Sequence, residues 1–159
     1  MSLARLDSLT AGLKRLPALL TATVGQVVQE NAYVLELDNQ HQLEEGLDTN
    51  GRDIGPEYTV TTVEIKKEKG QDADRVTLKD SGAFYRSLVA RVRSQDVELV
   101  GTDSKTQELQ QKYGNAVVGL SDEAVQDFRE EYIRPELEYQ TRQALGLAAH
   151  QVRIPLFIP

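Results

Sequence analysis

The stretch SLVARVRSQDVELVG, residues 87–101, decides the fold class of this chain. Apolar and basic side chains alternate over residues 87–93, and an alternating pattern returns over residues 97–101. Alternation of this kind is typical of a strand with one buried face, and two such strands separated by a short polar link form a hairpin. The intervening SQD supplies that link. The sequence therefore predicts an antiparallel β-hairpin.

Two helices are predicted on the N-terminal side of the hairpin. The first covers residues 3–16, and Pro17 is expected to break or kink it, because proline has no N–H and clashes with the preceding turn. The second is an amphipathic helix over residues 18–45, with Glu36 and Gln40 among the polar side chains of its outer face. The first helix carries leucines at intervals of three and four, on one face: Leu3, Leu6, Leu9, Leu13 and Leu16.

The segment between these helices and the hairpin is rich in turn-forming residues. Residues 48–53 resemble a calcium loop only in part, since Thr59 stands where the loop's bidentate glutamate belongs, and a turn is the favoured interpretation. Residues 59–70, TVTTVEIKKEKG, alternate and are β-branched. They predict a short strand, and a helix over the lysine-rich part stays open as an alternative.

Helices are predicted again after the hairpin. Ser104 is expected to cap a short helix over residues 105–113. Ser121 is a strong N-cap for a C-terminal helix, because acidic side chains follow it where the helix dipole favours negative charge. Pro135 must kink or divide that helix.

These elements predict a single α+β domain over residues 1–146. A long N-terminal helix and a C-terminal helix pack on a small antiparallel sheet built around residues 58–101. Residues 147–159 are expected to form an extended apolar C-terminal arm, in which alternating apolar residues suit strand addition to a sheet edge. Prolines bias such an arm to an edge position. Four of its side chains are expected to dock on a neighbouring subunit, with packing on the chain's own domain as the alternative: Ile154, Leu156, Phe157 and Ile158.

Composition excludes several classes of function. The chain has 159 residues, no cysteine, two histidines and a net charge of −7. Without cysteine there is no disulfide scaffold, thiolate nucleophile or cysteine-based metal site. The acidic balance argues against general nucleic-acid binding and against a polybasic membrane anchor, which both need a basic excess. No signal peptide or membrane span is predicted, so we expect an intracellular protein or a particle assembled inside a cell.

Local charge patterns point to surfaces and not to catalysis. The one basic neighbourhood could bind nucleic acid, but a charged edge strand that discourages aggregation is the favoured interpretation. Acidic and basic side chains alternate along the C-terminal helix, which predicts a solvated face with weak ion pairs. The basic neighbourhood comprises Lys66, Lys67, Lys69, Arg75 and Lys79.

Short motifs occur in an informative order between residues 78 and 121. LKDSGAFYRSL at residues 78–88 is followed by LVGT at 99–102, KYG at 112–114 and GLS at 119–121. This order, over roughly residues 36–146, resembles the small tail-completion and virion-morphogenesis proteins of tailed phages and the related tail-component family. In such a pattern Phe84 is expected to face one side of a strand and Tyr85 the other.

The resemblance implies a structural protein and no enzymatic activity. The chain would be a neck or tail-completion subunit, a head–tail connector of a tailed phage or prophage, located in the virion and assembled in the host cytoplasm. The implied partners are other copies in a ring, portal or head-completion or tail-terminator proteins, and genomic DNA that passes through the lumen without sequence-specific binding. An acidic lumen would let DNA slide. No membrane, cofactor or metal is implied.

Two polar segments are the remaining candidate contact sites. The loop over residues 48–54 and the lysines of residues 66–69 are expected to be exposed and to touch portal, tail or DNA. Two other classes of function stay open: an intracellular adaptor or regulatory binding domain, and a small metal-dependent hydrolase or nuclease, which the shortage of histidine disfavours. The candidate residues of the two segments are Asp48, Asn50, Arg52, Lys66, Lys67 and Lys69.

Overall fold

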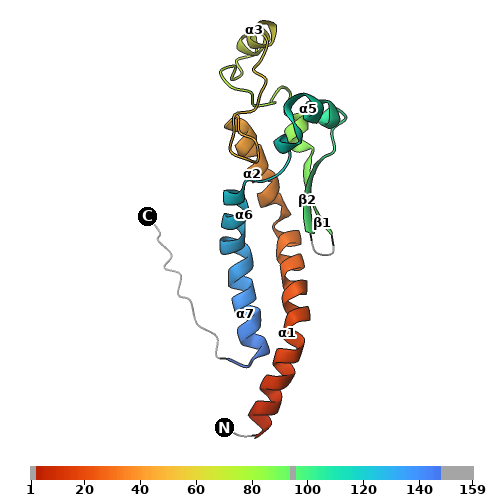
Figure 1. The fold of residues 1–159 in the computed structure, drawn as a ribbon, viewed down its shortest axis with the longest axis vertical. Coiled ribbons are helices and arrows are strands. Elements are labelled where there is room, and N and C mark those ends of the chain that lie inside the picture. Colours follow the sequence, from red (N-terminus) through yellow and green to blue (C-terminus); the bar gives the residue numbers. More distant parts are fainter. Residues whose placement is uncertain (1–2, 94–95, 148–159) are drawn as a thin grey trace, which may run out of the picture.

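A computed structural model describes residues 3–93 and 96–147. The molecule is elongated, with a long two-helix stem at one end and shorter elements at the other (Figure 1). The N-terminal elements are the helices α1 (Leu3–Glu30), α2 (Ala32–Glu44) and α3 (Val60–Glu68). Next come the short helix α4 (Ala83–Arg86) and the strands β1 (Leu88–Arg93) and β2 (Asp96–Gly101). The C-terminal elements are α5 (Thr106–Tyr113), the 3₁₀ turn η1 (Asn115–Val117), α6 (Asp122–Phe128), the π-helical turn η2 (Arg129–Ile133) and α7 (Arg134–Ala144).

The predicted α+β fold is confirmed, because a small antiparallel sheet packs with a long N-terminal helix and a C-terminal helix. The hairpin is also confirmed, with Leu88 opposite Gly101 and Val92 opposite Val97. The sheet has two strands in the described part of the chain. It is therefore smaller than the sheet that we predicted around residues 58–101.

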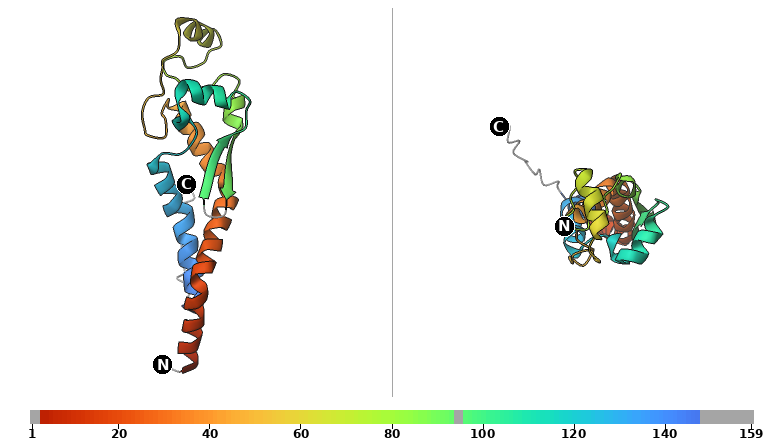
Figure 2. Two further views of the ribbon diagram at one scale, coloured as in Figure 1. Left: turned by 45° about the vertical axis from the view of Figure 1, so that its right-hand side comes forward. Right: turned by 90° about the horizontal axis from the view of Figure 1, so that it is seen from above.

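The stem is formed by α1 and by the C-terminal helix, which returns beside it in the opposite direction (Figure 2). The two backbones approach closely at Gly12, where a Cβ atom would overlap the carbonyl oxygen of Ala144. Farther along the stem, Val28 of α1 packs with Leu35 and Phe128 in a small apolar core. A second core, around Leu43, fills the opposite end of the molecule.

Helix α2 lies between the two cores and binds the surrounding segments through polar side chains. Asn39 is fully buried; its amide group donates to the carbonyl of Val117 (3.5 Å) and accepts from the N–H of Gly119 (3.4 Å). Glu36 accepts the N–H of Ala90 in β1 (3.0 Å), and Gln40 donates to the carbonyl of Tyr85 (3.2 Å). Our assignment of Glu36 and Gln40 to an outer polar face was therefore wrong, because both satisfy backbone groups of neighbouring elements.

The break that we predicted at Pro17 is absent, since α1 continues through it. The helix is interrupted at Asn31 instead. The side-chain amide of Asn31 donates to the carbonyl of Val27 (2.8 Å), which its own backbone N–H also reaches (3.1 Å). Asparagine competes in this way for helical carbonyls and favours helix ends. One side chain therefore separates α1 from α2.

The strand predicted over residues 59–70 is wrong, and the helical alternative is correct. Thr59 caps α3, and its hydroxyl accepts the N–H of Thr62 (3.3 Å). A threonine cap and the lysines in the last turn outweigh the β-branched composition. The opposite-face assignment of Phe84 and Tyr85 is also wrong, because both lie on the one-turn helix α4 and both are buried.

The C-terminal helix begins as predicted, since the Ser121 hydroxyl accepts the N–H of Ala124 (3.2 Å). The predicted division before Pro135 is confirmed as the π-helical turn η2, which separates α6 from α7. Because Pro135 has no N–H, one α-helical bond is lost here in any case. The cap predicted at Ser104 is wrong: α5 begins at Thr106, and Asp103 accepts the N–H of Lys105 (2.7 Å).

Two glycine substitutions in α1 test the packing of the stem. Gly12→Ala is expected to destabilise the protein by about 1–3 kcal/mol, because the new methyl group forces α1 and α7 apart. Gly25→Ala meets no atom within 4 Å and should stabilise it by about 0.5–1 kcal/mol, the usual gain for alanine over glycine in a helix. Urea unfolding followed by circular dichroism measures both changes. Equal effects of the two variants would contradict the close contact with α7.

Candidate interaction surfaces

The loop over residues 47–54 is a closed turn, as predicted. The Asp48 carboxylate accepts the backbone N–H groups of Asn50 (2.8 Å) and Arg52 (3.0 Å), and Leu47 pairs with Asp53 across the turn. Partial desolvation acts to raise the pKa of Asp48, but these hydrogen bonds outweigh it and hold the pKa below its ordinary value. Asp48 therefore stays ionised and keeps the loop in one shape.

The base of this loop is held by a backbone hydrogen bond and by a buried side chain. The N–H of Thr49 donates to the carbonyl of Ala116 (2.9 Å), and Ile54 is buried in the core around Leu43. Asn50 and Arg52 are exposed, as expected of contact residues, whereas Asp48 is only half exposed. The loop thus presents two polar side chains on a rigid base.

Lys66 is not an exposed contact residue, which corrects our prediction. Its side chain is buried, with a residue exposure of 6%. The ammonium group donates to the carbonyl of Lys79 (2.6 Å) and lies 4.9 Å from the ring centroid of Tyr58. Lys66 therefore joins α3 to the segment before α4, and this role is structural.

Two tyrosines hold the same segment from either side. The Tyr58 hydroxyl accepts the N–H groups of Thr77 and Leu78 (both 3.1 Å), and the Tyr85 hydroxyl donates to the carbonyl of Thr77 (2.6 Å). Burial raises the pKa of Tyr85 well above its ordinary value, so the hydroxyl keeps its proton. Residues 77–79 are fixed by these contacts without belonging to a sheet.

The basic neighbourhood is largely neutralised by acidic partners. Lys69 pairs with Asp80 (2.6 Å), and this hydrogen bond is the main reason that the pKa of Asp80 lies below its ordinary value. Lys79 pairs with Glu44, and Arg75 with Asp72 (3.5 Å). Lys67 is exposed. The neighbourhood therefore offers little unpaired positive charge for a nucleic-acid backbone.

The structure brings the loop and α3 together at one end of the molecule. A shallow pocket of about 270 Å³ lies between them and is lined from both sides, by Gly46 and Asp53 and by Tyr58 and Val63. The four contact residues predicted in the C-terminal arm, Ile154, Leu156, Phe157 and Ile158, lie outside the described residues.

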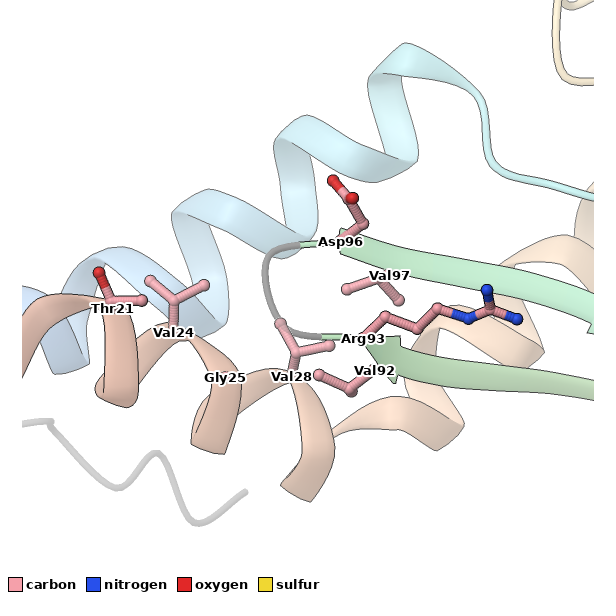
Figure 3. Close-up of a pocket in the computed structure, with 8 residues that line it drawn as sticks. All are labelled: Thr21, Val24, Gly25, Val28, Val92, Arg93, Asp96 and Val97. Atoms are coloured by element: carbon pink, nitrogen blue, oxygen red, sulfur yellow. The ribbon is translucent and has the colours of Figure 1, made fainter.

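Sequence reasoning missed an apolar groove beside the hairpin. Val92 and Val97 at the hairpin tip face Val24 and Val28 of α1 and enclose a hollow of about 280 Å³ (Figure 3). A second hollow of about 440 Å³ continues from Val97 toward Phe128 of α6. Alternation in β2 could have indicated an apolar strand face, but not that the helices leave it partly uncovered.

A second apolar surface lies at the free end of α1. Leu3 and Leu6 are 79% and 47% exposed and lie beyond Gly12, the point at which α7 ends. Leu13 is 57% exposed although α7 runs beside this part of α1. Leucines were predicted to share one face there, and the structure leaves much of that face in contact with water. Exposed apolar patches of this kind mark interaction sites in soluble proteins.

Comparison of the chain with family models, curated proteins and solved structures finds no match. Among the described residues, no helix has the length and apolar character needed to cross a membrane. Within residues 3–93 and 96–147, no group of three or more histidine, aspartate or glutamate side chains is placed to hold a metal ion. Acidic residues of η2 and α7 form exposed ion pairs, as predicted, with Arg134 bound to Glu130 (2.6 Å) and Glu138 (3.1 Å).

Lys66 and Lys67 form a matched pair that tests the structural role of the buried lysine. Lys66→Met is expected to destabilise the protein by about 1–3 kcal/mol, because the carbonyl of Lys79 loses its buried donor. Lys67→Met, at the next and exposed position, should change stability by less than about 0.5 kcal/mol. Thermal and urea unfolding measure both. A Lys66→Met variant with unchanged stability would contradict the structural role of Lys66.

Proposed function

We propose that this protein is a structural subunit of the neck or tail end of a tailed-phage or prophage particle. The order of motifs between residues 78 and 121 supports this proposal, since it resembles that of tail-completion and virion-morphogenesis proteins. In this proposal the chain assembles with copies of itself into a ring that joins head to tail. It carries out no reaction, and genomic DNA passes through the ring without sequence-specific binding.

The exposed leucine face of α1 is the observation that carries the proposal. Leu6 and Leu13 lie at helical spacing on one exposed face of α1, and burying each against another subunit contributes about 1.5–3 kcal/mol. A subunit that repeats around a ring needs such a face, because each copy must cover part of the next. The leucine face is therefore assigned to contact between copies.

The opposite end of the molecule is assigned to a different partner. Asn50 and Arg52 stand on a rigid loop, and Lys67 is exposed on the adjoining helix α3. A polar, rigid tip of this kind suits contact with a preformed portal, head-completion or tail-terminator ring, where register matters more than buried area. The net charge of −7 favours free passage of DNA through the lumen.

An adaptor or regulatory binding domain is the second candidate function. The same exposed leucines favour it, since they could bind an apolar helix of another protein. The two candidates differ in where the protein is found and in its stoichiometry: an adaptor is a monomer or dimer and does not enter particles.

Quantitative mass spectrometry of purified phage-like particles from the source organism tests the proposed function. The protein is expected in particles at a small fixed ratio to the portal, because a closed ring has a defined copy number. Its presence in induced cells combined with its absence from particles would contradict the proposal and favour the adaptor.

Substitutions on the leucine face test the contact between copies. Leu6→Ser together with Leu13→Ser is expected to weaken self-association or incorporation into particles at least about a hundredfold, from the lost apolar burial. Leu37→Ser is the matched control, because Leu37 is a 45% exposed leucine of α2 outside this face. Light scattering and particle composition measure assembly, and circular dichroism checks that both variants stay folded. Equal assembly of the double variant and the control would contradict the assignment.

A further inference from the structure

Within residues 3–93 and 96–147, some backbone groups on the outer edge of β2 have no hydrogen-bond partner. The N–H of Thr102 donates to the carbonyl of Ser87 (2.9 Å), so these two residues form a hydrogen-bonded pair at the open end of the hairpin. Hydrogen-bonded and non-hydrogen-bonded pairs alternate along an antiparallel ladder. Ala90 and Leu99 are therefore a non-hydrogen-bonded pair, and their N–H and C=O groups point away from the hairpin. The bond from the N–H of Ala90 to Glu36 confirms that direction for β1.

The two edges of the hairpin differ in how they are covered. The β1 edge faces α2, where Glu36 binds it. On the β2 edge, the outward N–H groups of Val97 and Leu99 have no hydrogen-bond partner among residues 3–93 and 96–147. An uncovered edge is a template for pairing with another strand.

An apolar groove lies directly beside this edge. The groove is the hollow of about 440 Å³ that Val97 and Leu99 share with α1 and α6, with Val28 and Leu35 on one side and Phe128 on another. Val97 and Leu99 are alternate residues, so their side chains point to the same face of the hairpin. A strand added to β2 would therefore place every second side chain over the groove.

The end of the chain has the pattern that such a strand requires. In VRIPLFIP, residues 152–159, all the even-numbered residues are aliphatic: Val152, Ile154, Leu156 and Ile158. Both prolines, Pro155 and Pro159, are odd-numbered. Successive residues of a strand direct their N–H groups to opposite edges, so the edge of the even-numbered residues keeps every donor and the prolines fall on the other edge. The segment can thus add to a sheet and then end it.

We propose that residues 152–159 of one copy add as a third strand to the outer edge of β2 in a neighbouring copy. Ile154, Leu156 and Ile158 then direct their N–H groups to β2 and their side chains into the groove, while Phe157 faces away from it. This inference rests on the proposed function only in requiring a neighbouring copy, and it names the acceptor site for the apolar arm.

A neighbouring copy is the better donor for geometric reasons. The last described residue, Leu147, lines a hollow together with Leu20 and Val24 of α1. Figure 1 shows that α7 ends near the foot of the stem, below the hairpin, whose strand β2 runs away from that end. A chain that continues from Leu147 into the groove of the same copy would run parallel to β2. The arm of another copy can bind antiparallel to β2, which is the slightly more stable pairing. Because arm and groove are different surfaces, the contact is head-to-tail and can close into a ring.

Binding of a labelled peptide tests the acceptor site. The acceptor is the full chain with Ile154→Asp, Leu156→Asp and Ile158→Asp, so that its own arm cannot compete. The probe is a fluorescent peptide of residues 150–159, HQVRIPLFIP, and anisotropy measures its affinity. We expect saturable binding. Absence of binding would overturn the proposal.

Backbone methylation of that peptide tests strand addition specifically. Methylating the N–H of Leu156 is expected to weaken binding at least about tenfold, because this donor faces β2. Methylating the N–H of Phe157 is the matched control and should change affinity less than about threefold, since this position shares its edge with the prolines. An equal loss of affinity from both methylations, or a loss only from methylation at Phe157, would overturn the assignment of the even-numbered edge to β2.

Cysteine pairs identify which copy donates the strand. The chain has no cysteine of its own, so a disulfide in a mixture of Val97→Cys with Ile154→Cys, Leu156→Cys or Ile158→Cys joins introduced cysteines only, and each variant oxidised alone gives its background of homodimer. Oxidation is expected to give a disulfide-linked dimer in one of these mixtures and not with Thr61→Cys, on exposed α3, as the control partner. A chain that carries both cysteines and closes an internal disulfide without dimer would overturn donation between copies. Particle composition tests the virion assignment separately.

Discussion

Polar side chains on α2 hold the backbone of its neighbours, and the rest of the fold depends on this arrangement. Asn39 binds both sides of the segment between η1 and α6, Glu36 binds β1, and Gln40 binds α4. Gln42 accepts the N–H of Ser121, the cap of α6. Short and irregular segments cannot satisfy their own backbone groups, and each unsatisfied buried group costs free energy. A single helix therefore positions the hairpin, the loops and the start of the C-terminal helix.

This arrangement explains why the molecule is elongated and has two cores. Leu35 and Leu43 flank Asn39 on the buried face of α2, one turn away on either side, and each belongs to a different core. One core lies between α1 and the C-terminal helix, and the other lies under α4 and α5. Neither core extends to the N-terminal end of α1 or to the outer edge of β2, so no part of residues 3–93 and 96–147 covers these two surfaces. The surfaces assigned to assembly are thus a consequence of how the core is divided.

Local patterns in the sequence were sufficient where a residue acts on its own neighbours. The Ser121 cap, the interruption before Pro135 and the hairpin were all predicted, since their causes lie within a few residues. Residues 59–70 were misassigned because their β-branched composition was read as a strand, while the cap at Thr59 and the contacts of Lys66 with Tyr58 and Lys79 favour a helix. The break in the N-terminal helix was placed at Pro17 because proline is the stronger signal, although α1 accommodates it and Asn31 ends the helix.

By itself the sequence determined the fold class, the hairpin and the apolar face at the start of α1, because alternation and helical spacing are properties of consecutive residues. It also determined that the even-numbered positions of residues 152–158 are aliphatic and that both prolines of this segment are odd-numbered. Only the tertiary structure decided that Lys66 is buried, that Glu36, Asn39 and Gln40 of α2 bind neighbouring backbone groups, and that no described segment covers the outer edge of β2 beside an apolar groove. Each of these three features depends on contacts between segments that are far apart in the sequence, and side-chain periodicity carries no information about such contacts.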